Sequence, residues 1–310
     1  MVVALGGNAI TREYEEGNIY EQFANTRQSL EGVLELIKLG HRVLITHGNG
    51  PQIGNYMIRV EESSDLVPTL PLGIMVADTE GGMGYMIEQC LQNEMHDMGI
   101  RREVACVVTQ VLVDKDDPAL KNPTKFVGPF YPKEKVEELR ERRGWIIKED
   151  PGRGFRRVVP SPKPKGIVER NVIRLLVENE VVVIAAGGGG VPVYIEDTGW
   201  LEGIDAVIDK DLASAVLAND IGADELMILT GVERVALNFG KPDQRFLDHL
   251  TVAEARRYLE EGHFPAGSMG PKIEAAINFL EGGGRRVVIT SIEKSVEAAY
   301  GRAGTVIVSA

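Results

Sequence analysis

The chain has 310 residues, of which 44% are hydrophobic and 26% charged, a composition typical of a folded globular protein. Its formal net charge of −12 disfavours nucleic-acid binding, for which a basic surface is expected. With no run of about 18 apolar residues and no basic leader, we expect neither a membrane span nor a signal peptide. Cys90 and Cys106 show no metal-ligand spacing, and we interpret both as core thiols of a cytoplasmic protein.

Short β-branched runs alternate along the chain with longer stretches of helical spacing. Strands are predicted over residues 1–5, 41–47, 103–113, 181–186, 225–230, 286–290 and 305–309. Helices are predicted over residues 20–39, 51–62, 72–98, 166–179, 209–221, 251–261, 270–281 and 292–299. Buried strands that alternate with helices form parallel sheets covered on both faces. We therefore predict an α/β fold, a three-layer αβα sandwich with an open, mainly parallel sheet, as one domain over residues 1–310.

Residues 114–164 interrupt this alternation. The segment is rich in Pro, Lys, Arg and Asp, contains a short helical piece near 133–143 and has no long buried strand. A disordered linker is the alternative, but the stretches GWII and FRRVVP carry enough apolar side chains for a small folded unit. We predict an inserted subdomain that protrudes from the main body.

Glycine-rich loops follow three of the predicted strands. They lie at residues 6–8, 48–50 and 187–190, and none matches a P-loop or a dinucleotide-binding fingerprint. A single loop of this kind is best explained as a tight turn. The carboxyl ends of parallel strands share one edge, however, and three loops there present backbone N–H groups to an anion. We predict that the four glycines at 187–190 let a phosphate touch the main chain.

Two lysines stand where helices are predicted to begin. Lys210 lies between two aspartates in the sequence DKD, for which a solvated helix cap is the alternative interpretation. Lys272 follows a Gly-Pro pair at another helix start, where a cation opposes the helix dipole, so we predict an anionic partner such as a nucleotide phosphate. His47, before a glycine loop, has either a phosphate contact or a structural role, and the histidines show no metal-ligand spacing.

These motifs together resemble those of the carbamate kinases, which belong to the amino acid kinase superfamily. The similar stretches are ALGGNAI, THGNGPQIGN, NPTKFVGPF, KEDPGRGFRRVVPSPKP, GGGGVPV, DAVIDKDLA, LTGVERVALNFGKPD and GHFPAGSMGPKIEAAI. They occur in family order and cover nearly the whole chain. The resemblance implies an amino acid kinase-like fold with a protruding subdomain over the substrate site, and a cytoplasmic homodimer of arginine metabolism.

The resemblance also implies a reaction. ADP and carbamoyl phosphate would be interconverted with ATP and carbamate, which breaks down to CO2 and ammonia, with Mg²⁺ carried by the nucleotide and no protein metal site. Phosphoryl transfer requires positioning and charge stabilisation more than covalent chemistry, so we expect direct in-line transfer without a covalent enzyme intermediate. Carbamate is already an anionic nucleophile, so no general base is expected.

The resemblance assigns roles to individual residues. Lys210 is expected to bridge the transferred phosphoryl group, Lys272 to hold the nucleotide phosphates, and Asp211 to orient the lysines. Lys125, on the insert, is expected to reach over the carbamoyl phosphate while the subdomain closes and excludes water. The expected phosphoryl-binding residues are Gly6, Gly7, Asn8, Gly48, Asn49, Gly50, Gly188 and Gly189. The expected nucleotide-binding residues are Lys210, Thr230, Gly231, Gly270 and Lys272, with the NFGKP segment beside them.

Three positions depart from the family pattern. Phe126 stands where the family usually has Pro, Glu80 where Gln is expected, and Gly231 where Asp is common. A carboxylate near a phosphate site is unfavourable, so Glu80 is expected either to point away or to have a cationic or Mg²⁺ partner.

Two rival functions are considered. One is a superfamily relative that phosphorylates another small carboxylate or phosphate, which would lack the NPTK insert. The other is a non-catalytic nucleotide sensor or storage protein, which would have lost Lys210, Asp211 or Lys272. The insert and all three residues are present.

Overall fold

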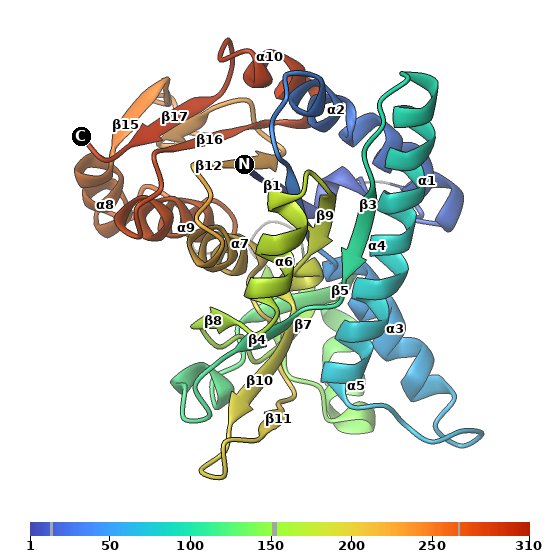
Figure 1. Ribbon diagram of the computed structural model, residues 1–310. Helices are drawn as coiled ribbons and strands as arrows, with labels where there is room; N and C mark the ends of the chain where they lie inside the picture. Colours follow the sequence, from blue (N-terminus) through green and yellow to red (C-terminus); the bar gives the residue numbers. More distant parts are fainter. Residues whose placement is uncertain (13–14, 151–153, 266) are drawn as a thin grey trace.

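The computed structural model describes residues 1–12, 15–150, 154–265 and 267–310 (Figure 1). An eight-stranded sheet forms the centre of the main body, in the order β15-β17-β16-β12-β1-β2-β9-β3. Its strands are β1 (Val2–Leu5), β2 (Leu44–His47), β3 (Val104–Val107), β9 (Val182–Ala185), β12 (Glu225–Thr230), β15 (His249–Thr251), β16 (Arg286–Ser291) and β17 (Thr305–Val308). Every neighbouring pair is parallel except β16 with β17. The predicted α/β fold with a mainly parallel sheet is confirmed.

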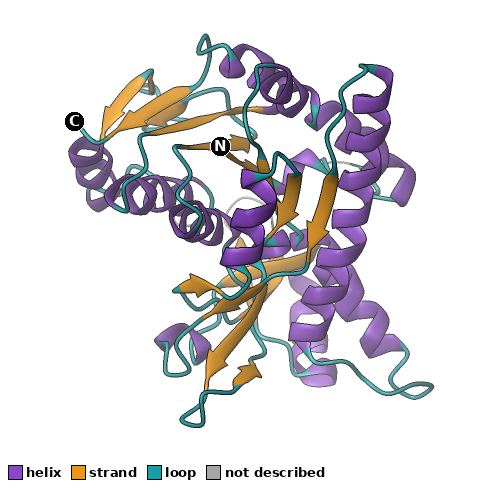
Figure 2. Ribbon diagram, viewed as in Figure 1, coloured by secondary structure: helices purple, strands orange, loops and turns teal. Residues whose placement is uncertain are grey.

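Helices cover both faces of this sheet (Figure 2). One face carries α1 (Ile19–Ser29), α2 (Glu31–Lys38), α4 (Leu72–Asp97) and α10 (Ser295–Ala299). The other carries α6 (Arg170–Glu178), α7 (Lys210–Asp220), α8 (Val252–Glu260) and α9 (Met269–Glu281). Alternate residues of β1 enter the two cores, since Val2 faces the α7 side and Val3 the α4 side. No helix in the described ranges is long and apolar enough to cross a membrane.

Two predicted elements are divided in the structure. The helix expected over 20–39 breaks at Leu30 into α1 and α2. The strand expected over 103–113 is two strands, β3 and β4 (Gln110–Leu112), which belong to different sheets. The second sheet has the order β11-β10-β4-β8, with β8 (Gly166–Ile167), β10 (Val191–Ile195) and β11 (Leu201–Gly203). Thr109 and Gln110 interrupt the apolar run at this point, but a single strand also accommodates two polar residues, so the pattern did not indicate the break.

Shorter elements complete the chain. A separate hairpin pairs β13 (Val235–Leu237) with β14 (Arg245–Leu247). The 3-10 turns are η1 (Gly7–Ala9), η2 (Pro118–Leu120), η3 (Lys133–Lys135), η4 (Gly187–Gly189) and η5 (Ile292–Lys294).

The insert contains more strand structure than its composition indicates. Three antiparallel strands in the order β5-β7-β6 form a sheet of their own, accompanied by α5 (Val136–Arg143). The strands are β5 (Lys125–Tyr131), β6 (Ile147–Asp150) and β7 (Gly154–Val159). Only Val127 and Gly128 of β5 are buried, which agrees with the expectation of no long buried strand, and Gly128 and Pro129 interrupt the alternation that would have indicated this strand.

The insert rests on α3 (Gly50–Glu62). A Cβ built on Gly54 would lie 1.9 Å from the Cα of Gly128, so the two backbones are in direct contact. At the far end of α3, the indole N–H of Trp145 donates to both oxygens of Glu61 at 3.0 and 3.1 Å, and Arg157 pairs with the same carboxylate at 2.5 Å. The helix that begins after the second glycine loop therefore ends beneath the insert.

Candidate active site

The first two glycine loops meet a lysine at one edge of the central sheet. They follow β1 and β2, which are neighbouring strands in register. A Cβ built on Gly48 would lie 3.5 Å from the backbone N of Gly7 and 3.9 Å from Cε of Lys210. The starts of α7 and α3 therefore face the ends of these two strands.

Two lysines share one carboxylate at this place. Lys210 Nζ donates to Asp211 Oδ1 at 2.5 Å, and Lys272 Nζ donates to Asp211 Oδ2 at 3.1 Å. The side chains of Lys210, Asp211 and Lys272 are 10%, 5% and 14% exposed. Lys210 is therefore no solvated cap residue, and the anionic partner of Lys272 within the chain is Asp211. We call these three residues the lysine cluster.

Burial and charge act against each other in the lysine cluster. Burial alone would raise the pKa of Asp211, but the two ammonium groups hold it well below its usual range. Burial lowers the pKa of Lys210, and the neighbouring Lys272 lowers it further. Although burial opposes it, the Asp211 carboxylate raises the pKa of Lys272. Two cations against one anion give a partly desolvated site that favours a bound anion.

The insert reaches the same helix start through Lys125. Its ammonium pairs with Asp209 Oδ2 at 2.5 Å. The other oxygen of Asp209 caps α7, accepting from the N–H groups of Asp211 and Leu212 at 2.9 and 3.3 Å. One aspartate thus joins the insert to the helix that carries Lys210.

The glycine run at 187–190 has a different explanation from the predicted one. All four residues are buried, and the last three have positive φ. A Cβ on Gly188 would lie 2.2 Å from Asn49 Nδ2, and one on Gly189 would lie 2.3 Å from the carbonyl oxygen of Ile208. The N–H groups of residues 187, 189 and 190 already donate within the protein. Close packing, more than an open anion surface, therefore requires the absence of side chains.

The other glycines expected at the site, and Asn8, lie in different surroundings. Gly7 and Gly50 have open space on the side where a Cβ would lie, whereas Gly6 packs against the carbonyl oxygen of Leu229, beside Thr230. Asn8 lies in η1, and its side chain falls outside the described part of the structure. Gly231 is exposed in the turn after β12, and Gly270 lies in the first turn of α9, two residues before Lys272.

The comparisons with known proteins agree with this geometry. The sequence pattern of the amino acid kinase family matches residues 1–291. The chain belongs to the amino acid kinase family.

Several carbamate kinases are similar to this protein over nearly the full chain. Carbamate kinase from Pyrococcus horikoshii is 49% identical over 307 residues, which cover 98% of both chains. That from Thermococcus kodakarensis is 50% identical over 311 residues, covering 99% of this chain and 98% of the relative. The structure of Giardia lamblia carbamate kinase bound to AMP-PNP has a TM-score of 0.89 and 41% identity, and covers 99% and 97% of the two chains. The resemblance inferred from the motifs is confirmed.

Two polar residues of α4 that hold the loops of this family member were not assigned a role from the sequence. Thr79 Oγ1 accepts from Asn49 Nδ2 at 3.0 Å. Glu80, 1% exposed, accepts from the backbone N–H groups of Thr109 and Gly187. Glu80 was expected either to point away or to have a cationic or Mg²⁺ partner; within the described residues its carboxyl group accepts from main-chain donors. These two residues could have been recognised in the sequence as polar residues at positions of a long helix that are expected to be buried.

His47 has a structural position behind the second loop. Its side chain is fully buried, Nδ1 lies 3.3 Å from the carbonyl oxygen of Gly48, and Nε2 has no hydrogen-bond partner among the described residues. Burial lowers the pKa of His47 to about 4, so the ring is neutral near pH 7. The structure therefore favours a structural role for His47 over a phosphate contact.

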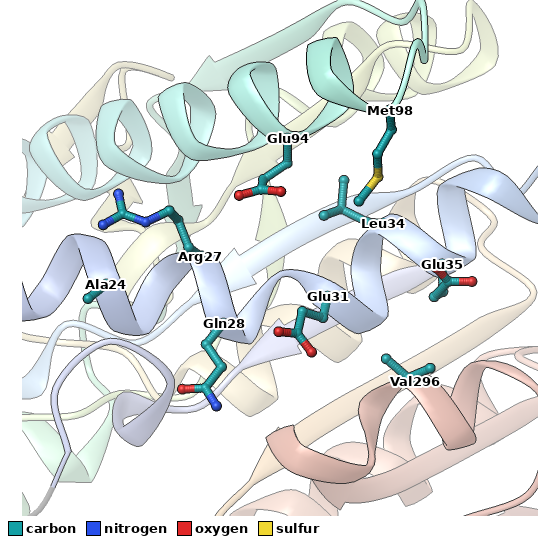
Figure 3. Close-up of a pocket in the computed structure, with 9 residues that line it drawn as sticks. All are labelled: Ala24, Arg27, Gln28, Glu31, Leu34, Glu35, Glu94, Met98 and Val296. Atoms are coloured by element: carbon teal, nitrogen blue, oxygen red, sulfur yellow. The ribbon is translucent and has the colours of Figure 1, made fainter.

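A cavity of about 520 Å³ lies away from the lysine cluster, between α1, α2, α4 and α10 (Figure 3). Its lining residues are Ala24, Arg27, Gln28, Glu31, Leu34, Glu35, Glu94, Met98 and Val296. The lining has three carboxylates and one guanidinium, so its net charge is negative and disfavours phosphate. The lysine cluster is the better anion site. Within the described residues, no group of three or more His, Cys, Asp or Glu is arranged to hold a metal ion.

Proposed function

We propose that the protein is a carbamate kinase that transfers a phosphoryl group reversibly between ATP and carbamate. The observation that carries the proposal is the lysine cluster, which places two ammonium groups beside the loops at the ends of β1 and β2. The near-half identity to carbamate kinases supports the choice of carbamate as acceptor. The NPTK insert, retained here, disfavours a relative with another small acceptor.

The proposed reaction is a direct in-line displacement. An oxygen of carbamate attacks the γ-phosphorus of ATP, the bond from that phosphorus to the ADP oxygen breaks, and no proton has to be removed from the nucleophile. Lys210 would neutralise charge on the transferred group, and Lys272 would hold the nucleotide phosphates. Both oxygens of Asp211 are engaged by the lysines, so Asp211 orients them and leaves Mg²⁺ to be carried by the nucleotide phosphates. The Mg²⁺ would supply further charge neutralisation.

The insert at 114–164 would cover the acceptor side of the site. Lys125 already reaches the start of α7 through Asp209, and substrate anions would compete for its ammonium. Phosphoryl-binding roles for residues 6–8, 48–50, Gly188 and Gly189, and nucleotide-binding roles for Thr230, Gly231 and Gly270, remain part of this proposal. A cytoplasmic homodimer acting in arginine metabolism is supported by the resemblance alone.

ATP formation from MgADP and carbamoyl phosphate tests the proposal. We expect turnover by the wild type and by Lys133→Ala, an exposed lysine of the insert, and a loss of about 100-fold or more for Lys210→Ala. A folded protein that binds ADP but forms no ATP would overturn the proposal and favour the nucleotide sensor.

A further inference from the structure

Glu80 ties together two segments that are distant in the sequence. Its Oε1 accepts from the N–H of Gly187 at 2.9 Å, and both its oxygens lie 3.2 Å from the N of Thr109. Thr109 in turn accepts from Ala186 through Oγ1 at 2.9 Å, and from the N–H of Val191 through its carbonyl at 2.8 Å. Glu80 and Thr109 together therefore hold both ends of the glycine run.

The glycine run held in this way supports the second loop of the site. Its turn packs against the side chain of Asn49, which also donates to Thr79, the residue before Glu80. Asn49 is the N-cap of α3 and follows Gly48, which lies against Lys210. One turn of α4 thus holds both the second and the third loop through Thr79 and Glu80. A shift of the glycine turn would displace Asn49, which lies next to the lysine cluster.

Among the residues that the structure describes, no cation is recorded as acting on the Glu80 carboxyl group. A Cβ on Gly187 would lie 2.9 Å from Glu80 Cγ and 2.3 Å from Nε2 of His47, whose ring is neutral because burial lowers its pKa. Burial also raises the pKa of the Cys106 thiol to about 12, so that group is neutral too. The charged neighbour that acts on Glu80 is acidic, Glu169. Burial thus raises the pKa of Glu80 to about 8, although the main-chain donors oppose it.

We propose that Glu80 is a positioning residue of the phosphoryl-transfer site, which as a neutral acid ties the glycine turn to Thr109 and which loosens this tie on losing its proton. An ionised carboxylate in this pocket is destabilised unless the turn moves and water enters. A glutamine here could accept the N–H groups of Gly187 and Thr109 through its one carbonyl oxygen, as Oε1 does, without ionising. The effect on turnover rests on the proposed function, whereas the tie itself does not.

The pH dependence of turnover should differ between the wild type, in which Glu80 can ionise, and Glu80→Gln, in which the side chain cannot. We would compare wild type, Glu80→Gln and Asp97→Asn, a control that removes an exposed charge from the same helix, over pH of about 6 to 10. We expect kcat/KM of the wild type and the control to fall by about 10-fold through a limb near pH 8, and the Glu80→Gln limb to be absent. Superimposable profiles of wild type and Glu80→Gln would overturn the proposal.

Hydrogen exchange followed by mass spectrometry tests the tie without catalysis. In peptides that cover residues 181–190 and 48–57, we expect exchange corrected for its intrinsic rate to accelerate above about pH 8 in the wild type and not in Glu80→Gln. Glu80→Leu, which removes both acceptors, should accelerate it at every pH. If turnover is absent and this contrast is present, the proposed function fails and the tie from Glu80 to the glycine turn stands. If the contrast is absent in a protein that turns over, the positioning role fails.

Discussion

Lys125 and Asp209 form an ion pair of 2.5 Å although 84 residues separate them in the sequence. Because Asp209 is also the N-cap of α7, the same side chain contacts the insert and begins the helix that carries Lys210. The position of the insert is thereby coupled to the position of the lysine cluster.

Replacement of Asp209 by Asn tests this coupling with little effect on the helix. Asn caps helices about as well as Asp, so α7 should begin unchanged while Lys125 loses its partner. The pair is partly exposed and contributes at most about 1 kcal/mol, but we expect kcat/KM for carbamoyl phosphate to fall by about 3- to 10-fold. In a double-mutant cycle, Lys125→Met should cost less in the Asp209→Asn background than in the wild type. Additive losses in kcat/KM would show that the two residues act separately.

Replacement of Asp211 by Asn should lower both stability and turnover. It leaves two buried ammonium groups without their carboxylate, which costs on the order of 3–5 kcal/mol of unfolding free energy. Turnover should fall by about 100-fold or more, because the lysines lose their orientation. The pKa of Asp211 is lowered in the folded state, so its stabilisation is complete above its unfolded pKa of about 3.8 and is lost as pH falls. Urea unfolding at several pH values should show the two proteins converging in acid; a constant difference would contradict this account.

The contribution of Glu80 to stability should be lost as pH rises, whereas that of Asp211 is lost as pH falls, and replacement of Glu80 by Gln tests this. The folded pKa of Glu80 is about 8, against 4.5 for the ordinary carboxyl, so its contribution is complete below about pH 4.5 and is lost as pH rises through about 8. The free energy of unfolding of Glu80→Gln, relative to that of the wild type, should therefore increase between pH 4.5 and about 8 and stay constant above pH 8. Urea midpoints from pH 5 to 9 measure this, and a pH-independent difference would show that Glu80 is ionised throughout.

Replacement of Gly54 by Ala should disturb the seat of the insert. The new methyl group would meet the backbone of Gly128 at 1.9 Å, which neither backbone can accommodate without moving. We expect a loss of about 1–3 kcal/mol in unfolding free energy and reduced turnover. Gly82→Ala, in an exposed position of α4 with nothing within 4 Å of the new Cβ, is the matched control and should be neutral or stabilising. Equal stability of the two variants would mean that the insert adjusts freely.

The sequence allowed the sheet, most helices and the helix starts at Lys210 and Lys272 to be predicted, because each leaves a local pattern. The link between the two lysines through Asp211 was expected only from the family resemblance. The alternation of strands and helices indicated the layers, and the DKD and GPK motifs contain Lys210 and Lys272 next to their helix starts. The break at residues 108–109 was missed, because the polar pair Thr109 and Gln110 that stands there also fits a continuous strand. The tie from Glu80 to Gly187 spans 107 residues, and no local pattern reports a contact at that separation.

The order of strands also constrains how the protein is made. β1 leaves the ribosome before the other strands of its sheet and can pair with β2 early, but its other neighbour, β12, ends only at Thr230. Until then β1 presents an unpaired apolar edge, which readily pairs with another chain. Completion of the lysine cluster waits longer still, for Lys272. A nascent or truncated chain that stops before β12 should therefore be both inactive and prone to aggregation, and dependent on chaperones until the C-terminal strands are synthesised.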